Sequence, residues 1–426
     1  MKIFHSALMI FLILIYLSGF SQEDYSFDPE EYEKSALSYG GFIEMNSSLS
    51  FLAKDHAFYF LNYYQDKKSI AINNSFTAQA DLQYSVDFFN AYLKVNTELS
   101  YDGGEWKEKL NLYNARISLS PFDFLTFKAG KDTLKWGKGY AFNPVAFLDR
   151  PKNLDDPEAA LEGFTVFITD LTFTFDKDLK VFSLTSVLLP VYESLNSDFG
   201  KEDNWNFAFK AYFLLLDTDI DLIALISPSR TNRFGIDFSR NLGSNFEIHG
   251  EAAYIFDSPK KTILSTEISD EFQILGGIRY VTEFDLTLFF EYYHNSNGMT
   301  QREMEAFYSL VHTGYSNYLA SNLDALLIQA DTVFKNSFAR PNPMKDYFYL
   351  KISQKEPFNI LYLTSSLTSI LNIQDKSFTL SLDLLYILFT NFELNLRGSG
   401  FYGTKSSEFA EKTSFYKMEG RVLYYF

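Results

Sequence analysis

The chain of 426 residues carries a formal net charge of -17, which argues against nucleic acid as a partner because phosphate binding needs a basic surface. It has no cysteine, so disulfides, thiolate catalysis and cysteine metal sites are excluded. Aromatic residues make up 18% of the chain although the mean hydropathy is only -0.12. That balance suits strands with one face toward lipid and the other toward water.

The N-terminal stretch 1–21 has the layout of a secretory signal peptide, with Lys2 near its start, an apolar run over 7–17 and a small-residue end. An uncleaved N-terminal anchor is the alternative. Because no cysteine follows, a lipoprotein anchor is excluded. Residues 22–36 are acidic and aperiodic, which predicts a disordered periplasmic tail.

From residue 37 to residue 426 the chain predicts an all-β, antiparallel transmembrane β-barrel. Segments of alternating polar and apolar residues recur, separated by short turns such as Phe122-Asp123-Phe124 and Phe284-Asp285-Leu286. Turns of this kind predict about eighteen strands, with sixteen as the main alternative. We assign these short turns to the periplasmic side. In the strand expected at 163–175, Asp170 breaks the alternation, which indicates either a bulge or an error in the register that we assign to this strand.

The connection at 133–161 contains a motif that begins at the end of the preceding strand. Gly130 and Lys131 are followed by W-G-x-G and then by F-N-P. This pattern resembles porin-like barrels of the alginate-export type and related uncharacterised outer-membrane channels. The resemblance implies a loop that folds back toward the pore and narrows it, formed by Lys131, Trp136, Gly137, Gly139, Phe142, Asn143 and Pro144. A surface loop held by its own Trp and Pro packing is the alternative.

A second long connection, 295–345, has helical character. Thr300 and Glu303 form a capping box that starts a helix reaching about His312, and a second helix is expected from Asn322 to Phe334. Their apolar faces need a partner. They are expected to cap or enter the pore, to pack on a partner protein, or to stack on each other.

The last strand, 414–426, alternates apolar residues and ends in Tyr424, Tyr425 and Phe426. Its pattern resembles the assembly signal read by the bacterial barrel-insertion machinery, with Tyr424 and Phe426 as the residues read. The resemblance implies that this machinery is a partner during insertion into the outer membrane.

Charged residues on the lumenal faces form two sets. A basic set comes from early and final strands, and an acidic set comes from strands about half a barrel away. We hypothesise a basic wall facing an acidic wall across the pore. The alternative is that these charges merely hydrate and pair. The basic set is Lys94, Arg116, Lys128, Arg397, Lys417 and Arg421, and the acidic set is Asp237, Glu247, Glu251 and Glu291.

No catalytic motif is found in the sequence, and neither a cofactor nor a metal is predicted. His249, between Glu247 and Glu251 on one lumenal row, is a candidate for metal binding or acid/base chemistry, but such a row more often lines water. His294, beside Tyr293 at the outer end of a strand, is expected to be structural.

The sequence therefore predicts a protein of the bacterial outer membrane that is not an enzyme and that contacts outer-membrane lipid. Its expected function is passive diffusion of small or medium hydrophilic solutes, with anionic solutes as the candidate preference. The alternative is a barrel subunit of a secretion or lipid and polysaccharide export complex, with the loop 295–345 as a docking surface for a partner protein.

Overall fold

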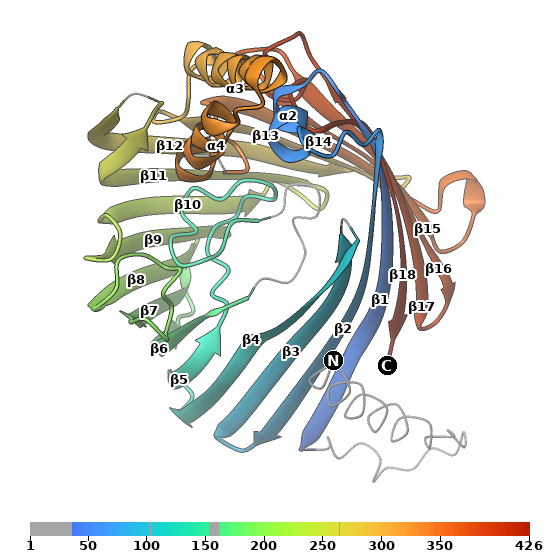
Figure 1. Ribbon diagram of the computed structural model, residues 1–426. Helices are drawn as coiled ribbons and strands as arrows, with labels where there is room; N and C mark the ends of the chain where they lie inside the picture. Colours follow the sequence, from blue (N-terminus) through green and yellow to red (C-terminus); the bar gives the residue numbers. More distant parts are fainter. Residues whose placement is uncertain (1–35, 103, 153–161, 264, 339) are drawn as a thin grey trace.

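The computed structural model describes residues 36–102, 104–152, 162–263, 265–338 and 340–426. Within these residues the chain forms eighteen strands, each paired antiparallel with the next along the sequence. The last strand also pairs with the first, which closes the sheet into a barrel (Figure 1). The prediction of about eighteen strands is confirmed. The expected signal peptide 1–21 and all but the last residue of the expected tail lie outside the described residues.

The strands are β1 (Leu37–Leu52), β2 (Ile70–Val86), β3 (Phe89–Asp102), β4 (Glu105–Phe122), β5 (Leu125–Asp132), β6 (Phe164–Thr174), β7 (Leu179–Val191), β8 (Asn204–Leu215), β9 (Thr218–Ile226), β10 (Arg233–Asn241), β11 (Phe246–Lys261), β12 (Thr266–Val281), β13 (Leu286–Asn295), β14 (Asp346–Lys355), β15 (Leu363–Asn372), β16 (Phe378–Phe389), β17 (Phe392–Tyr402) and β18 (Ser414–Tyr425). The helices are α2 (Ala57–Tyr63), α3 (Gln301–Ser321) and α4 (Ala325–Val333), with the shorter η2 (Phe334–Phe338) and η3 (Pro357–Asn359).

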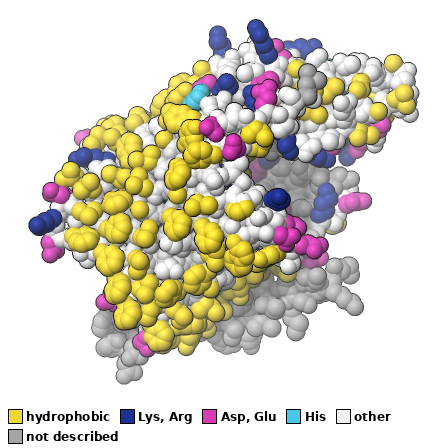
Figure 2. Space-filling view, turned by 90° about the vertical axis from the view of Figure 1, so that its left-hand side faces the viewer, with side chains coloured by type: hydrophobic (Ala, Val, Ile, Leu, Met, Phe, Trp, Pro, Cys, Tyr) yellow, Lys and Arg dark blue, Asp and Glu magenta, His cyan; other side chains and the backbone are white. Residues whose placement is uncertain are grey.

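Alternation along each strand separates an apolar exterior from a polar interior. In β16, Leu382 is 50% exposed, whereas its neighbours Ser381 and Asp383 on the other face are buried. Hydrophobic side chains cover much of the outer surface in Figure 2, and charged side chains gather toward its edges. A Lys or Arg facing lipid at mid-depth would cost about 2 to 4 kcal/mol, so this surface suits a bilayer.

The barrel closes where the end of β18 meets the start of β1. The backbone of Phe426 exchanges two hydrogen bonds with Gly41, at 3.1 and 3.2 Å. A Cβ atom on Gly41 would lie 2.6 Å from the Phe426 ring and 2.2 Å from the carbonyl oxygen of Gln79. Only a glycine fits at this position without movement of the neighbouring backbone.

All of the long connections lie at one end of the barrel, after odd-numbered strands. Even-numbered strands up to β16 lead into the next strand through short turns, several of which place Asp or Gly at positive φ, as at Asp87 (46°), Asp217 (58°) and Gly243 (113°). These residue types adopt such backbone angles most readily, which is why the turn motif recurs in the sequence. We assign this end to the periplasm and the end with the long loops to the exterior.

The irregularity expected at Asp170 is absent from the described pairing. β6 pairs with β5 and with β7 without any shift in register, and Asp170 faces inward, where its carboxylate lies 2.8 Å from the ammonium of Lys128. The alternation looked broken because Val166 and Ile168, on the same face, are apolar and buried beneath a loop inside the barrel. The bulge was therefore wrong, and the alternative, an error in the assigned register, accounts for Asp170.

The helices form a cap over part of the extracellular end. The capping box of Thr300 and Glu303 is present as predicted, but α3 continues beyond His312 to Ser321 and ends where Asn322 adopts a left-handed conformation (φ 58°). The short helix α2 was not predicted. It packs against α3 through Phe60 and Tyr315, whose rings stack with centroids 4.0 Å apart.

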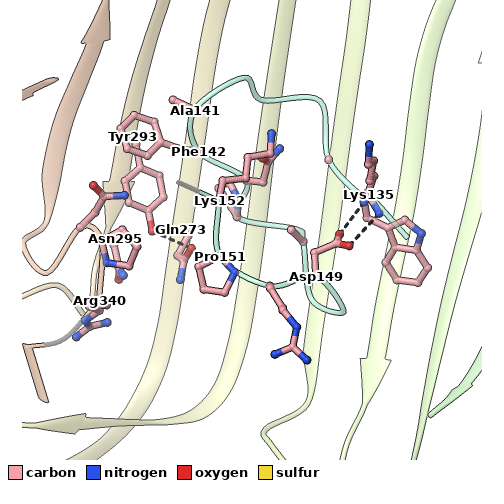
Figure 3. Close-up of a pocket in the computed structure, with 18 of the residues that line it drawn as sticks. Lys135, Ala141, Phe142, Asp149, Pro151, Lys152, Gln273, Tyr293, Asn295 and Arg340 are labelled. Atoms are coloured by element: carbon pink, nitrogen blue, oxygen red, sulfur yellow. Dashed lines mark hydrogen bonds between the residues drawn. The ribbon is translucent and has the colours of Figure 1, made fainter. Parts of the chain in front are cut away.

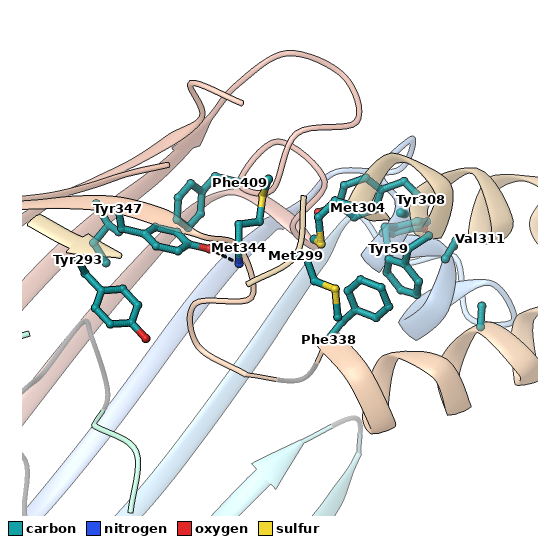
Figure 4. Close-up of a cluster of buried hydrophobic side chains, with 14 of the residues drawn as sticks. Tyr59, Tyr293, Met299, Met304, Tyr308, Val311, Phe338, Met344, Tyr347 and Phe409 are labelled. Atoms are coloured by element: carbon teal, nitrogen blue, oxygen red, sulfur yellow. Dashed lines mark hydrogen bonds between the residues drawn. The ribbon is translucent and has the colours of Figure 1, made fainter. Parts of the chain in front are cut away.

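The apolar faces of α3 and α4 are buried against the barrel rim as well as against each other. Figure 4 shows Met304, Tyr308 and Val311 of α3 beside Tyr59 of α2, with Phe409 and Tyr347 in the same cluster. Phe409 belongs to the β17–β18 connection and Tyr347 to β14. The cap thus joins loops that lie far apart in the sequence. No helix in the described part of the chain is both long and apolar enough to cross a membrane.

Candidate functional site

Residues 133–152, the first described part of the connection that follows β5, fold into the barrel (Figure 1). We call this segment the inward loop. Its apolar side chains Val145, Phe147 and Leu148 are at most 2% exposed and pack against apolar residues on the inner faces of β6 to β11. Burial of this apolar area against the barrel wall holds the loop inside the lumen.

Glu251 of β11 anchors the middle of the inward loop. Its carboxylate accepts hydrogen bonds from the backbone N–H groups of Lys138 and Gly139, both at 2.6 Å. The N–H of Val145 at 3.2 Å and the side-chain amide of Asn143 at 3.1 Å complete the set. Hydrogen bonds to a charged acceptor are the stronger kind, so this carboxylate fixes the loop conformation.

Glu291 of β13 binds the next turn of the same loop. It accepts hydrogen bonds from the backbone N–H groups of Tyr140, of Ala141 at 2.9 Å and of Phe142 at 3.3 Å. The imidazole Nε2 of His249 lies 3.0 Å from the same carboxylate. His249 therefore belongs to the anchoring of the loop, and Gly277 on the neighbouring strand leaves room for its ring.

The two glycines of the W-G-x-G motif allow the backbone to approach Glu251. Gly137 has φ +101°, and a Cβ there would lie 2.8 Å from a Glu251 carboxylate oxygen. At Gly139 a Cβ would lie 2.0 Å from the carbonyl oxygen of Phe142. The motif is thus explained by tight folding of the backbone over a wall carboxylate.

The other members of the motif also lie in this folded segment. Trp136 is buried, and its backbone N–H donates to the Asp149 carboxylate at 2.9 Å. Lys131 pairs with Glu162 at the point where the loop leaves β5. Pro144 lines a cavity on the extracellular side of the loop.

Lys138 and Lys152 attach the loop further, and neither was singled out from the sequence. The Lys138 ammonium lies 3.0 Å from Asp221 of β9 and 4.0 Å from Asp237 of β10. Lys152 donates to the carbonyl oxygens of Gly139 and Tyr140, both at 3.0 Å. An isolated lysine in a loop gives no sequence signal for such a role, because the partners come from distant strands.

The predicted acidic wall is largely covered by this loop. Asp237, Glu251 and Glu291 do face inward, but they are 0%, 3% and 0% exposed, so they are buried and do not line open water. Glu247 alone keeps some exposure, and it accepts a hydrogen bond from Ser239 at 3.1 Å. The described residues therefore do not form an open acidic wall that faces a basic one.

Most of the predicted basic residues face inward and are paired with carboxylates. Arg116 lies 2.8 Å from Asp132, and Lys128 lies 2.8 Å from Asp170. Arg397 pairs with Asp383 at 2.5 Å, and Lys417 and Arg421 share Glu419 at 2.6 and 2.8 Å. Lys94 stands opposite Asp81 in the β2–β3 register. Because these basic side chains are paired with carboxylates on the barrel wall, most of the net electric field expected from the basic set is cancelled.

The loop separates two cavities. The outer chamber, of about 550 Å³, lies on the side of the long loops, because its lining includes Arg230 and Arg340 from the connections after β9 and β13. Figure 3 shows Lys135, Asp149, Lys152 and Arg340 around this cavity. The described residues that line it include six cationic side chains and one carboxylate. The cations are Lys135, Arg150, Lys152, Arg230, Arg233 and Arg340, and the carboxylate is Asp149.

The inner chamber, of about 740 Å³, lies on the side of the short turns, and Tyr140 of the loop is among the residues that line it. Its described lining mixes four cations, three carboxylates, hydroxyl groups and aromatic rings. A smaller cavity of about 250 Å³, bordered by Tyr140, Lys152 and His249, lies at the level of the loop. In the described part of the chain, no group of three or more His, Asp or Glu is placed to hold a metal ion.

A closed eighteen-stranded barrel with a lipid-facing exterior and a wet, loop-narrowed interior defines a porin-like protein of the bacterial outer membrane. Comparison with solved structures agrees with this fold. OccAB1 of Acinetobacter baumannii aligns over 96% of this chain and 99% of its own, with a TM-score of 0.54 and 10% identity. OpdL of Pseudomonas aeruginosa aligns over 92% of this chain and 98% of its own, with a TM-score of 0.54 and 13% identity. OccK5 (OpdH) of Pseudomonas aeruginosa aligns over 91% of this chain and 97% of its own, with a TM-score of 0.53 and 12% identity.

In sequence, no protein-family model and no curated protein matches the chain. The structural comparisons support the porin-like barrel but not the narrower resemblance to alginate-export channels, since the similar structures are Occ and Opd proteins.

Proposed function

We propose that this protein is a passive outer-membrane channel for small hydrophilic solutes and that its outer chamber favours anions. The observation that carries the preference is the excess of cationic side chains around that chamber. A cavity lined by one sign of charge raises the local concentration of solutes of the opposite sign and speeds their capture.

Two of the arginines are held in place by aromatic rings. The guanidinium of Arg230 lies 3.8 Å from the centre of the Phe199 ring, and one of its N–H groups donates to the carbonyl oxygen of Phe147 at 3.3 Å. Burial lowers the pKa of Arg230 to about 10, so it stays protonated at neutral pH. Arg150 lies 4.5 Å from the centre of the Phe164 ring and pairs with Asp198.

Among the described residues that line the outer chamber, Asp149 is the one carboxylate, and it does little to offset these charges for a solute. Asp149 accepts hydrogen bonds from the backbone N–H groups of Lys135 and Trp136, both at 2.9 Å. Because its oxygens are turned toward the loop backbone, the carboxylate stabilises the fold of the loop.

The test is the reversal potential in planar bilayers under a potassium chloride gradient. Wild-type protein is expected to be anion-selective. Replacing Lys135 and Arg340 by glutamine should reduce the anion-to-cation permeability ratio by about twofold per charge, the effect of a unit charge about 8 Å away in water. Lys335→Gln is the matched control, since Lys335 lies on η2 and pairs with Asp331 at 2.6 Å. A cation-selective wild type, or an unchanged ratio in the double variant, would reject the preference.

A barrel that serves a partner complex is the second proposal. It is favoured by apolar side chains that remain exposed at the end of α3 and beyond, Leu319 at 58%, Leu323 at 67% and Ile328 at 56%. A channel that acts alone conducts as a purified chain, whereas a complex subunit is sealed and is recovered with a stable partner.

A further inference from the structure

The inner chamber differs in chemistry from the outer one. Three hydroxyl side chains lie side by side on its wall, because Thr287 of β13 is the register partner of Ser353 of β14, which is the register partner of Ser366 of β15. All three line the cavity. Thr364 and Thr368 continue the hydroxyl surface above and below Ser366 on the same face of β15.

These hydroxyl groups are available to a solute. Within the described residues, no side-chain hydrogen-bond partner is found for Thr287, Ser353 or Ser366, whereas Thr368 bonds to Tyr349. A hydroxyl both donates and accepts, so adjacent hydroxyls on neighbouring strands present alternating donors and acceptors about 4.8 Å apart.

The charges near this row largely cancel one another. Ser366 is the register partner of Asp383, which pairs with Arg397 at 2.5 Å. Lys351 donates to the hydroxyl of Tyr140 at 2.7 Å. Aromatic side chains, among them Phe42, Tyr113, Tyr349 and Tyr425, form much of the remaining lining.

We infer that the inner chamber is a binding subsite for a neutral polyhydroxylated ring, as in a saccharide, distinct from the anion-favouring outer chamber. Ring hydroxyls bond to the row formed by Thr287, Ser353 and Ser366, which we call the hydroxyl row, and the apolar C–H face of the ring packs on the aromatic lining. The inference rests on the proposed channel function, because the solute reaches this chamber by passing the inward loop.

The test measures the concentration at which the neutral trisaccharide raffinose blocks the single-channel current. The comparison is a polyethylene glycol of equal hydrodynamic radius. Raffinose is expected to block at lower concentration than the glycol, which fills the same volume without ring hydroxyls. The triple variant Thr287→Val, Ser353→Ala, Ser366→Ala should weaken raffinose block by about tenfold, the loss of one or two net hydrogen bonds. The control is Ser365→Ala with Ser369→Ala, on the opposite face of β15, which should leave block unchanged.

Equal block by raffinose and the glycol, or unchanged raffinose block in the folded triple variant, would overturn the subsite. The reversal potential separates this failure from failure of the proposed function. If anion selectivity persists while raffinose shows no advantage, only the subsite is rejected. If raffinose block depends on the hydroxyl row in a channel without anion selectivity, the subsite stands and the charge preference is rejected.

Discussion

Replacing Glu251 and Glu291 together by alanine is expected to raise the single-channel conductance severalfold. These two carboxylates accept the hydrogen bonds of the loop backbone from Lys138 to Val145. A hydrogen bond to a charged group contributes about 1.5 to 3 kcal/mol, so losing even two of them shifts the population of the docked loop by roughly a hundredfold. A loop that leaves the lumen joins the two chambers and widens the path for ions.

The matched control for this variant is Glu247→Ala. Glu247 lies on the same inward face of β11, four residues before Glu251, and bonds to Ser239 rather than to the loop. It should leave conductance close to wild type. Unchanged conductance in the double variant, shown to be folded by heat-modifiable mobility in detergent gels, would mean that these carboxylates do not hold a constriction.

Gly41→Ala is expected to weaken the closed barrel strongly. The added methyl group would lie 2.2 Å from the carbonyl oxygen of Gln79 on β2 and 2.6 Å from the terminal Phe426 ring, so the β1–β2 pair and the seam between β1 and β18 both have to shift. Overpacking of this kind typically costs about 1 to 3 kcal/mol, and here it adds to lost pairing at the barrel seam. The measurement is the temperature at which the compact band converts to the unfolded band in detergent gels.

Gly398→Ala provides the comparison, because nothing lies within 4 Å of a Cβ at Gly398 on the neighbouring strand β17. It should convert at the wild-type temperature. If both variants behaved alike, the tight contact between Gly41 and Phe426 would have no part in closing the barrel.

The fold could be predicted because a barrel strand lies between two different solvents and therefore shows its alternation in the sequence itself. In β18, Lys417, Glu419 and Arg421 face inward between apolar residues that face out, as the period of two indicates. The alternation failed as a guide at Asp170, where a loop inside the barrel makes apolar residues face inward as well.

The site could be predicted only in part, because its contacts join residues far apart in the chain. The W-G-x-G motif identified the loop that enters the barrel. The partners of that loop, Glu251 and Glu291, were identified as inward-facing carboxylates, but their burial follows from a contact across more than 100 residues. The arginines of the outer chamber, such as Arg230 and Arg340, come from separate loops without periodicity, and nothing in the sequence groups them.

The most direct test of the account is planar-bilayer recording from the purified wild-type chain alone. A barrel whose outer and inner chambers lie on either side of the inward loop should insert in discrete conductance steps, with a reversal potential displaced toward that of chloride. A folded barrel that inserts but leaves the bilayer sealed, and that conducts only with a second protein, would contradict the central claim of an independent channel.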